Sequence, residues 1–525
     1  MPPAAATDRR QLLRLAAASA AAGWWPRSAW SQPPLAENPF LLGVASGSPA
    51  ADSVVLWTRL VAPGLRELAA GAVTVGWEVA HDEGFREIVR SGQAQALPEL
   101  AHAVHVEADG LAPDRWYHYR FHVGAWRSPV GRTRTWPQPG AAMARLRLGF
   151  ASCQRWEHGW YAAWRHLRAE APDAVVFLGD YIYEYPSAFG AVRVPDGQWA
   201  TTLAEYRARH ALHKSDADLQ AMHAACPWLL TWDDHEVQND YAGAAPGNAG
   251  PAITDFAARR AAAYQAYYEH MPLRAGVLAR ALQGLREGAE LRLYGRHRIG
   301  GLVDLCLLDN RQYRDVQACT RGGRHGSSTV DPKDCAAWAD PARTLLGAEQ
   351  ERWLGRQVAE PGATWTVLGQ GTLFGARDLK PGPGETYWND GWDGYAASRQ
   401  RLVEALRGGR ATNPVLLGGD VHENWVGHVK ADYARPDSAN VGVEFCGTSI
   451  TSRAGTGDAT PARLAENPHF IHARADERGY GVADFLPSRL EVRLRTLDDV
   501  TRPDAEVRTQ AAFVVQAGRP VVERA

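Results

Sequence analysis

Four apolar runs of this chain each end in side chains of the kind that bind metal ions. They lead to Cys153, to Asp180 with Tyr183, to Asp234 with His235, and to Asp420 with His422. A short apolar run bounded by loop residues is typical of a buried strand. In open α/β sheets, ligands bind at the carboxyl edge, where such strands end. Four ends that carry sulfur, phenol, imidazole and carboxylate groups therefore predict a layered α/β fold around one shared metal centre.

A lone aspartate at a strand end is more often a loop or helix cap than a metal ligand. Here the set of four strand ends reverses that preference, because buried carboxylates and imidazoles without a cation would be costly to desolvate. Oxygen ligands suit a hard ion such as calcium, and this set offers Asp180, Asn239 and Asp420. A thiolate, a phenolate and an imidazole suit a transition metal, above all ferric iron, and these come from Cys153, Tyr183 and His422.

The first 31 residues have the pattern of an export signal. Arg9 and Arg10 precede an apolar stretch, residues 12–25, and small residues near Ser31 offer a cleavage site. This pattern predicts passage through the twin-arginine export machinery and a periplasmic or secreted protein. An ordinary amphipathic N-terminal helix is the alternative. The stretch is shorter than a typical membrane-spanning helix, and we expect no stable membrane span.

Charge and cysteine content exclude two further classes. Charged residues make up 22% of the chain and the formal net charge is −2, so no basic surface for nucleic-acid scaffold binding is expected. Six cysteines in 525 residues do not make a disulfide-rich scaffold. Cys319 and Cys335 flank a Gly/Arg/Ser-rich loop and are predicted to pair in an oxidising compartment. Cys226, Cys306 and Cys446 lie in apolar contexts typical of buried thiols.

The hydrophobic pattern changes along the chain. Residues 38–137 contain short alternating runs separated by Gly, Pro and Asp, which is typical of an all-β domain. Within them, residues 111–119 resemble the tyrosine corner of an immunoglobulin or fibronectin sandwich, with Tyr117 or Tyr119 as its tyrosine. In residues 145–500, apolar strands alternate with helical stretches, which predicts an α/β domain. The pattern predicts no definite structure for residues 501–525.

A set of short motifs follows the same order along nearly the whole mature chain. They are Gly-Val-Ala-Ser-Gly-Ser48, Phe-Ala-Ser-Cys153-Gln, Gly-Asp180-Tyr-Ile-Tyr183-Glu, Tyr206-Arg207, Trp232-Asp-Asp-His-Glu-Val-Gln-Asn239, Asp309-Asn-Arg311-Gln-Tyr313, Asp393-Gly-Tyr395 and Gly-Asp420-Val-His422. This order resembles the PhoD family of secreted alkaline phosphatase/phosphodiesterases, a branch of the calcineurin-like metallophosphoesterases. One departure is Asn310, where the family usually has threonine.

The resemblance implies a small all-β immunoglobulin/fibronectin-like domain, residues 38–137, before a four-layer α/β/β/α metallophosphoesterase sandwich, residues 145–500. It also implies one ferric iron and calcium. The implied iron ligands are Cys153, Asp180, Tyr183 and His422, and the implied calcium ligands are Asp180, Asn239 and Asp420. Asp234 would contact metal, while His235 would face the phosphoryl oxygen or the leaving group. The register of ligands within residues 233–239 stays open, because adjacent acids alternate there.

The implied reaction is hydrolysis of phosphate mono- and/or diesters by a metal-activated hydroxide, with two ions about 3.5–4 Å apart. No Gly-x-Ser-x-Gly elbow or Walker loop suggests another mechanism. Arg207 could join Asp234 and His235 in the catalytic set, and Arg311 could also bind phosphate, although ion pairing is the commoner role of an arginine. Five residues could line the substrate cleft or simply pack: His158, Trp160, Trp388, Trp392 and Tyr395. The alternative function is a non-enzymatic exported binding protein with a degenerate metal site.

Overall fold

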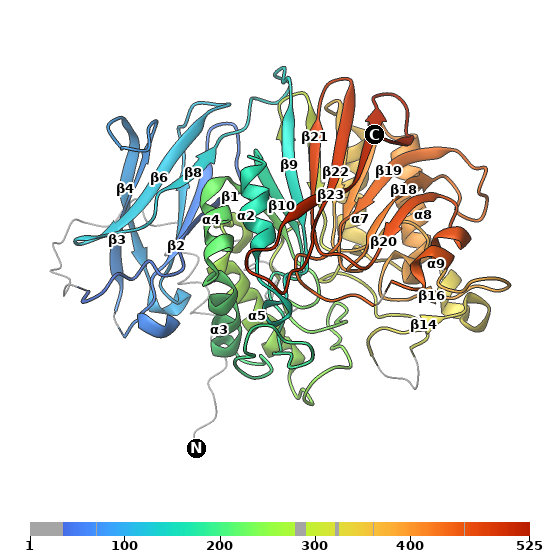
Figure 1. Ribbon diagram of the computed structural model, residues 1–525, viewed down its shortest axis with the longest axis horizontal. Coiled ribbons are helices and arrows are strands. Elements are labelled where there is room, and N and C mark those ends of the chain that lie inside the picture. Colours follow the sequence, from blue (N-terminus) through green and yellow to red (C-terminus); the bar gives the residue numbers. More distant parts are fainter. Residues whose placement is uncertain (1–34, 70, 279–289, 321–324, 361, 456) are drawn as a thin grey trace. The chain divides into compact units, whose positions relative to one another are not determined.

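The computed structural model describes residues 35–69, 71–278, 290–320, 325–360, 362–455 and 457–525 (Figure 1). The chain forms two compact units. The first contains the described residues up to 136 together with 201–228 and 257–292, and the second contains residues 137–200, 229–256 and 293–525. The predicted export signal, residues 1–31, lies outside the described residues. Within the described residues, no helix is both long and apolar enough to cross a membrane.

The first unit is built mainly from antiparallel strands. One sheet has the order β4-β3-β6-β7, with β8 also paired to β6: β3 (Val73–Ala80), β4 (Ile88–Ala96), β6 (Trp116–Val123), β7 (Trp126–Arg127) and β8 (Gly131–Arg134). A second group pairs β1 (Val44–Gly47) with β2 (Val54–Arg59), and β2 with β5 (Ala103–Ala108). Every second side chain of β6 is buried, from Tyr117 to Val123, as expected for a strand with one face toward a core.

The predicted tyrosine corner is present at the start of β6. The hydroxyl of Tyr117 accepts a hydrogen bond from the backbone N–H of Ala112 at 2.9 Å. Among the described residues, the first unit also contains α3 (Leu203–Lys214), α4 (Ala217–Ala225) and nearly all of α5 (Phe256–His270). These helices come from the middle of the chain, within the 145–500 range that the sequence suggests for one catalytic domain.

The second unit contains two sheets. The first has the order β24-β23-β22-β21-β9-β10-β11: β9 (Leu146–Ala151), β10 (Ala174–Leu178), β11 (Trp228–Thr231), β21 (Gly479–Phe485), β22 (Arg489–Leu497), β23 (Val507–Gln516) and β24 (Val522–Arg524). The second has the order β12-β13-β15-β17-β19-β18-β20: β12 (Gly295–Ile299), β13 (Val303–Leu307), β15 (Trp365–Gly369), β17 (Pro414–Gly418), β18 (Asn424–Lys430), β19 (Asn440–Cys446) and β20 (Phe470–Arg474). Residues 507–524, for which the sequence pattern predicts no definite structure, thus complete one edge of the first sheet.

The two sheets pack face to face and helices cover their outer faces. Between the sheets, the ring of Trp365 lies 6.1 Å from that of Phe485. Outside the first sheet, α2 (Ala162–Ala169) places Trp164 6.0 Å from Phe177 of β10. Outside the second sheet, α7 (Gly347–Ala359) and α8 (Ala396–Gly408) share one apolar cluster with β13, β15 and β17. The expected four-layer α/β/β/α arrangement is confirmed. A short helix, α9 (Thr460–Glu466), and a two-stranded ribbon, β14 (Thr329–Val330) with β16 (Tyr387–Trp388), complete the unit.

Candidate metal centre

Both sheets of the second unit deliver their strand ends to one place. Cys153 follows β9, Asp180 follows β10 and Asp233 follows β11, while Asp420 and His422 follow β17 of the other sheet. β9 pairs in parallel with β10, so their last residues lie at the same edge. All these side chains belong to the second unit. The convergence that the four apolar runs predict is therefore present.

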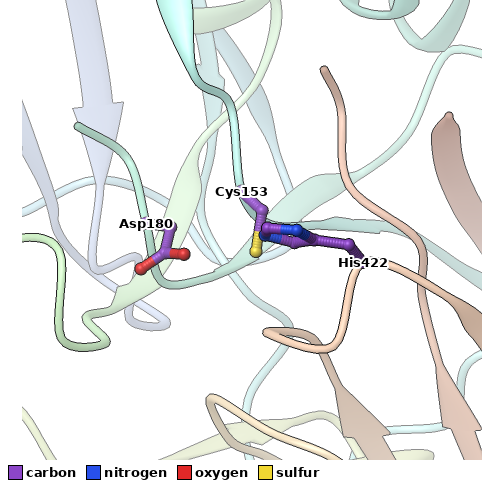
Figure 2. A group of neighbouring side chains, drawn as sticks. All are labelled: Cys153, Asp180 and His422. Carbon is purple, nitrogen blue, oxygen red and sulfur yellow. The ribbon is translucent and has the colours of Figure 1, made fainter. Parts of the chain in front are cut away.

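One half of the centre combines a thiol, a carboxylate, an imidazole and a phenol. Potential ligand atoms of Cys153, Asp180 and His422 lie within 4.8 Å of one another (Figure 2). The hydroxyl of Tyr183 donates to Asp180 Oδ2 at 3.0 Å and lies 3.2 Å from His422 Nε2. It also accepts a hydrogen bond from Ser452 Oγ at 2.6 Å. The four residues implied as iron ligands thus meet around one point.

The other half of the centre is acidic. Three further groups have potential ligand atoms within 4.8 Å of one another: Asp180 with Asp234 and His235, Asp233 with Asp234 and Asp420, and Asp234 with Asp240 and Asp390. Asp234 belongs to all three groups and Asp180 to both halves, so these two carboxylates connect the centre. The sequence did not single out Asp240, and it showed Asp390 only as a member of the motif Trp388-Asn-Asp-Gly-Trp-Asp393-Gly-Tyr395 and not as a ligand. Both lie in loops with several polar residues, where no pattern distinguishes one acid from its neighbours.

The backbone is left-handed at most of these strand ends. Cys153, Asp180, Asp420 and His422 have φ of 58°, 57°, 65° and 56°, and Asp240 has 59°. A residue with a β-carbon pays a steric penalty in this region, so such conformations persist only where the surrounding structure holds them. The chain therefore turns sharply directly after these strands, at the residues that carry the potential ligands.

A buried arginine lies among the acids. Arg311 pairs with Asp233, with Asp390 at 2.7 Å and with Asp234 at 3.4 Å, and its side chain is 1% exposed. Although burial opposes ionisation, Arg311 and then His235 lower the pKa of Asp234 to about 2. Of the two roles open to Arg311 from the sequence, the structure places it in buried ion pairs within the centre.

Two glutamates that the sequence shows only as neighbours of ligands support the centre. Glu184 accepts hydrogen bonds from His235 Nδ1 and from the backbone N–H of Asn239, each at 2.7 Å. Glu236 accepts from the backbone N–H groups of Asp180 at 3.0 Å, Tyr181 at 2.5 Å and Asp233 at 2.8 Å. Both lie inside motifs quoted above, and a glutamate flanked by apolar or aromatic residues was the one signal that could have identified them.

Comparison with known proteins identifies this geometry. The profile of the PhoD-like phosphatase family matches residues 148–494, and that of the PhoD-like phosphatase N-terminal domain matches residues 26–137. The chain belongs to the PhoD-like phosphatase family. It is 45% identical over 494 residues to alkaline phosphatase D of Bacillus subtilis (strain 168), covering 92% of this chain and 82% of that protein. A solved structure of PhoD superimposes with a TM-score of 0.87 at 44% identity, covering 94% of this chain and 93% of that one.

Membership of the PhoD-like family makes this chain a phosphoric ester hydrolase, so the non-enzymatic binding protein is not favoured. The donor set also fits bound cations. Asp180 Oδ1 and Asp233 Oδ2 are buried and have no hydrogen-bond donor within the part of the chain that the structure describes, which is unusual for carboxylate oxygens. Burial, and the charges of Asp234 and Asp233, raise the pKa of Asp180 well above its usual value. A cation would satisfy these oxygens and remove the repulsion.

Arg207, implied as a member of the catalytic set of this PhoD-like enzyme, lies elsewhere. It belongs to α3 of the first unit and pairs with Glu269 at 2.6 Å and with Glu67 at 3.0 Å. Its Nη2 also donates to the carbonyl of Glu99 at 3.0 Å. The structure therefore shows Arg207 in the structural role that was its alternative, because two carboxylates already occupy its guanidinium group.

The aromatic candidates divide between core and surface. Trp392 and Tyr395 are fully buried and belong to the cluster under α7 and α8, so they pack. Trp388 is half-buried in β16, and Trp160 is 37% exposed. His158 borders a cavity next to His422, described below. The predicted disulfide between Cys319 and Cys335 is present, and the other four cysteines are buried and take no part in it.

Proposed function

We propose that this protein hydrolyses phosphate mono- and diesters at a centre of ferric iron and calcium. The observation that carries the proposal is the convergence of a thiol, a phenol and an imidazole on one side of Asp180 and of carboxylates on the other. A calcium-only site has no use for a thiolate, and zinc rarely takes a tyrosine, whereas ferric iron accepts both. The proposed iron ligands are Cys153, Asp180, Tyr183 and His422.

Calcium is proposed for the acidic side of the centre. The proposed ligands are Asp180, Asp234, Asn239 and Asp420. Glu184 supports this assignment, because it fixes the backbone of Asn239 beside His235. When bound, two such cations activate water and stabilise charge on the attacking and leaving oxygens of a phosphoryl group. The side chains of the protein itself position the substrate and transfer protons.

His235 is proposed to donate to the phosphoryl oxygen or the leaving group. Its Nδ1 donates to Glu184, which leaves Nε2 as the nitrogen available to a substrate. Burial opposes the charged ring, but Glu184, Asp180 and Asp234 raise its pKa well above the usual value. A protonated imidazole can donate a proton as the leaving oxygen departs. Glu184 acts through His235 and is therefore a positioning residue.

Arg311 is proposed to hold the acidic side together. Asp233, Asp234 and Asp390 would repel one another strongly in a buried site, and the guanidinium group contacts all three. Because no hydrogen of Arg311 is needed for the phosphoryl group in this scheme, its role differs from that of an arginine that clamps phosphate.

We further propose that the mature protein is exported through the twin-arginine pathway to the periplasm or the exterior. The support is the Arg9-Arg10 pattern in the sequence, together with the disulfide between Cys319 and Cys335, a bond that persists mainly in oxidising compartments.

The proposal can be tested by assaying the purified protein with bis(4-nitrophenyl) phosphate and with 4-nitrophenyl phosphate. We expect both esters to be hydrolysed, a calcium-selective chelator to abolish turnover, and added calcium to restore it. Metal analysis before and after chelation should show iron retained and calcium lost. Asp234→Asn, which removes a shared carboxylate, should fail to recover with calcium. Full activity of calcium-free protein would contradict the calcium assignment, and failure of metal-loaded protein on every ester would contradict the function.

A further inference from the structure

A cavity of about 310 Å³ adjoins the iron side of the centre. Its lining includes His158, Thr451, Arg453 and Arg478. Two of these residues form backbone hydrogen bonds with proposed iron ligands. The carbonyl of Arg453 accepts from His422 Nδ1 at 2.7 Å, and the backbone N–H of Thr451 donates to the carbonyl of Cys153 at 3.4 Å. The wall of the cavity is therefore also the support of the centre.

His158 offers a hydrogen-bond donor near this cavity. Its Nδ1 accepts the backbone N–H of Arg453 at 3.2 Å, so the hydrogen of the neutral ring is on Nε2. That nitrogen is buried and has no hydrogen-bond partner among the described residues. Burial, with the charges of Arg155 and Arg453, lowers the pKa of His158 to about 3, which keeps the ring neutral. A buried donor without an acceptor is unfavourable unless a ligand supplies one.

Arg453 offers a positive charge at the same place. Its Nη2 donates to the carbonyl of Gly190 at 2.7 Å, but it has no carboxylate partner among the described residues. A β-carbon at Gly190 would come within 1.8 Å of Arg453 Nη1, so only glycine lets the guanidinium group lie across this loop. The ring of Phe189, which is 81% exposed, lies 5.9 Å from the same guanidinium group. The loop therefore holds the cation in place while leaving its charge unneutralised.

The acids that line the cavity already have partners. Asp476 pairs with Arg474 at 2.6 Å, Glu477 pairs with Arg508, and Asp498 pairs with Arg502 at 3.5 Å. Asp499 accepts the backbone N–H of Thr501 at 2.9 Å. Asp476, Glu477 and Asp498 are thus paired with arginines, while His158 Nε2 and the guanidinium group of Arg453 are two side-chain donors with no carboxylate partner among the described residues. Both favour an oxygen acceptor, and the guanidinium group favours one that carries negative charge.

We propose that this cavity is a second anion subsite, in which Arg453 and His158 bind a charged group of the substrate other than the phosphoryl group under attack. The proposal rests on the phosphoesterase function and adds a substrate class to it. The preferred substrates are phosphate esters that carry a second phosphate or another anion. Since that group is not the one that reacts, Arg453 contributes to KM and leaves kcat nearly unchanged.

Matched phosphonates test the subsite without being hydrolysed. Alkylphosphonates and the corresponding α,ω-bisphosphonates, with linkers of two to five carbons, serve as competitive inhibitors of 4-nitrophenyl phosphate hydrolysis in excess calcium. We expect at least one bisphosphonate to inhibit the wild-type enzyme about tenfold better than its monophosphonate. Arg453→Gln and His158→Phe should each remove most of this advantage, Arg453→Lys should keep part of it, and Gly190→Ala should reduce it by displacing the guanidinium group. Calorimetric titration of the same pairs measures binding independently of turnover.

The control is Arg435→Gln, at an exposed arginine that pairs with Asp432, and it should behave as the wild type. Equal affinity of the wild-type enzyme for every pair would overturn the proposal, as would a bisphosphonate advantage that survives in Arg453→Gln. Loss of iron and of kcat in Arg453→Gln would show instead that Arg453 acts only as a support of His422. Absence of ester hydrolysis with a retained binding advantage would contradict the proposed function and leave the subsite standing.

Discussion

Glu184 accepts a hydrogen bond from Nδ1 of His235 at 2.7 Å, and neither side chain is exposed by more than a tenth. The same carboxylate accepts the backbone N–H of Asn239. One acid therefore fixes the imidazole that is proposed to face the substrate and the turn that carries a proposed calcium ligand. The pair arises because Glu184 follows Tyr183 directly, so the loop after β10 contributes both a proposed iron ligand and a proposed positioning residue.

Replacement of Glu184 should reduce catalysis more than binding. In Glu184→Gln, the amide keeps the shape of the side chain but loses the charge that favours the protonated imidazole. We expect kcat to fall about 100-fold with KM within about a factor of two, measured with 4-nitrophenyl phosphate. The matched control is Glu205→Gln, which removes a helix-capping glutamate in α3 and should leave kcat unchanged. An unchanged kcat in Glu184→Gln would contradict the role given to the pair.

Cys153 and Tyr183 should give the iron its colour. Ferric iron bound to phenolate or thiolate absorbs visible light by charge transfer, so concentrated active enzyme should be coloured. We expect Cys153→Ser to lose iron and most activity, and Tyr183→Phe to shift or erase the band while the ring still packs. Absorption spectra and metal analysis check both results. A colourless active enzyme that contains only calcium or zinc would show that the iron assignment is wrong.

The disulfide between Cys319 and Cys335 should matter for stability more than for chemistry. The two cysteines are 16 residues apart in sequence, and closing a loop of that length contributes about 3 kcal/mol in the chain-entropy treatment. We expect the double variant Cys319→Ser, Cys335→Ser to lose about that much free energy of unfolding in urea denaturation, with kcat retained because neither cysteine contacts a proposed ligand. Unchanged unfolding, or free thiols at both positions in exported protein, would refute the prediction.

Glu444 should make stability depend on pH. It is fully buried in β19 and accepts the backbone N–H groups of Phe374 and Gly375, yet burial raises its pKa from 4.5 to about 7. The folded state then holds this proton more tightly than the unfolded state does. The contribution of this group to the free energy of unfolding is fully present below about pH 4.5. It is lost as pH rises to about 7, a change of about 3 kcal/mol.

Denaturation of wild type and Glu444→Gln across this pH range isolates that effect. The difference in free energy of unfolding between the two proteins should shift by about 3 kcal/mol in favour of the variant between pH 4.5 and pH 8. A matched control is Glu360→Gln, whose side chain is half-exposed. A difference that stays constant with pH would mean that the pKa of Glu444 is the same in the folded and the unfolded protein.

Export should depend on the two arginines near the N-terminus. Changing Arg9 and Arg10 to lysine conserves charge but breaks the twin-arginine pattern. We expect the variant precursor to remain in the cytoplasm while the wild type reaches the periplasm or the medium, as measured by cell fractionation. Equal amounts of exported variant and wild type would show that another route is used.

The parts of the centre that follow strands could be predicted from the sequence, because an apolar run and the residue after it are neighbours in the chain. Arg311 and Asp233 are different, since their contact joins residues 78 positions apart. No local pattern distinguishes such an arginine from one that binds phosphate. Arg207 illustrates the same limit, because its motif suggested catalysis while its partner Glu269 lies 62 residues away.

The fold shows a similar division. The alternation of strands and helices predicted an α/β domain and the family resemblance implied its four layers, and both expectations were confirmed. The helices α3, α4 and α5 belong to the first unit although they lie in the middle of the chain. This assignment depends on tertiary packing, which hydrophobic periodicity does not encode. β23 was missed although residues 511–515 form an apolar run. Most of its side chains are only partly buried, and its place in the sheet depends on pairing with β22 and β24.

The left-handed turns at Cys153, Asp180, Asp420 and His422 set stability and activity against each other. Glycine would remove the backbone strain at each position, so a mutation to glycine is expected to raise the stability of the fold while removing a proposed ligand. In a lineage no longer selected for catalysis, we expect these residues to be replaced before the core residues of the α/β/β/α sandwich. Their retention in a sequenced relative is then a better sign of working chemistry than overall identity.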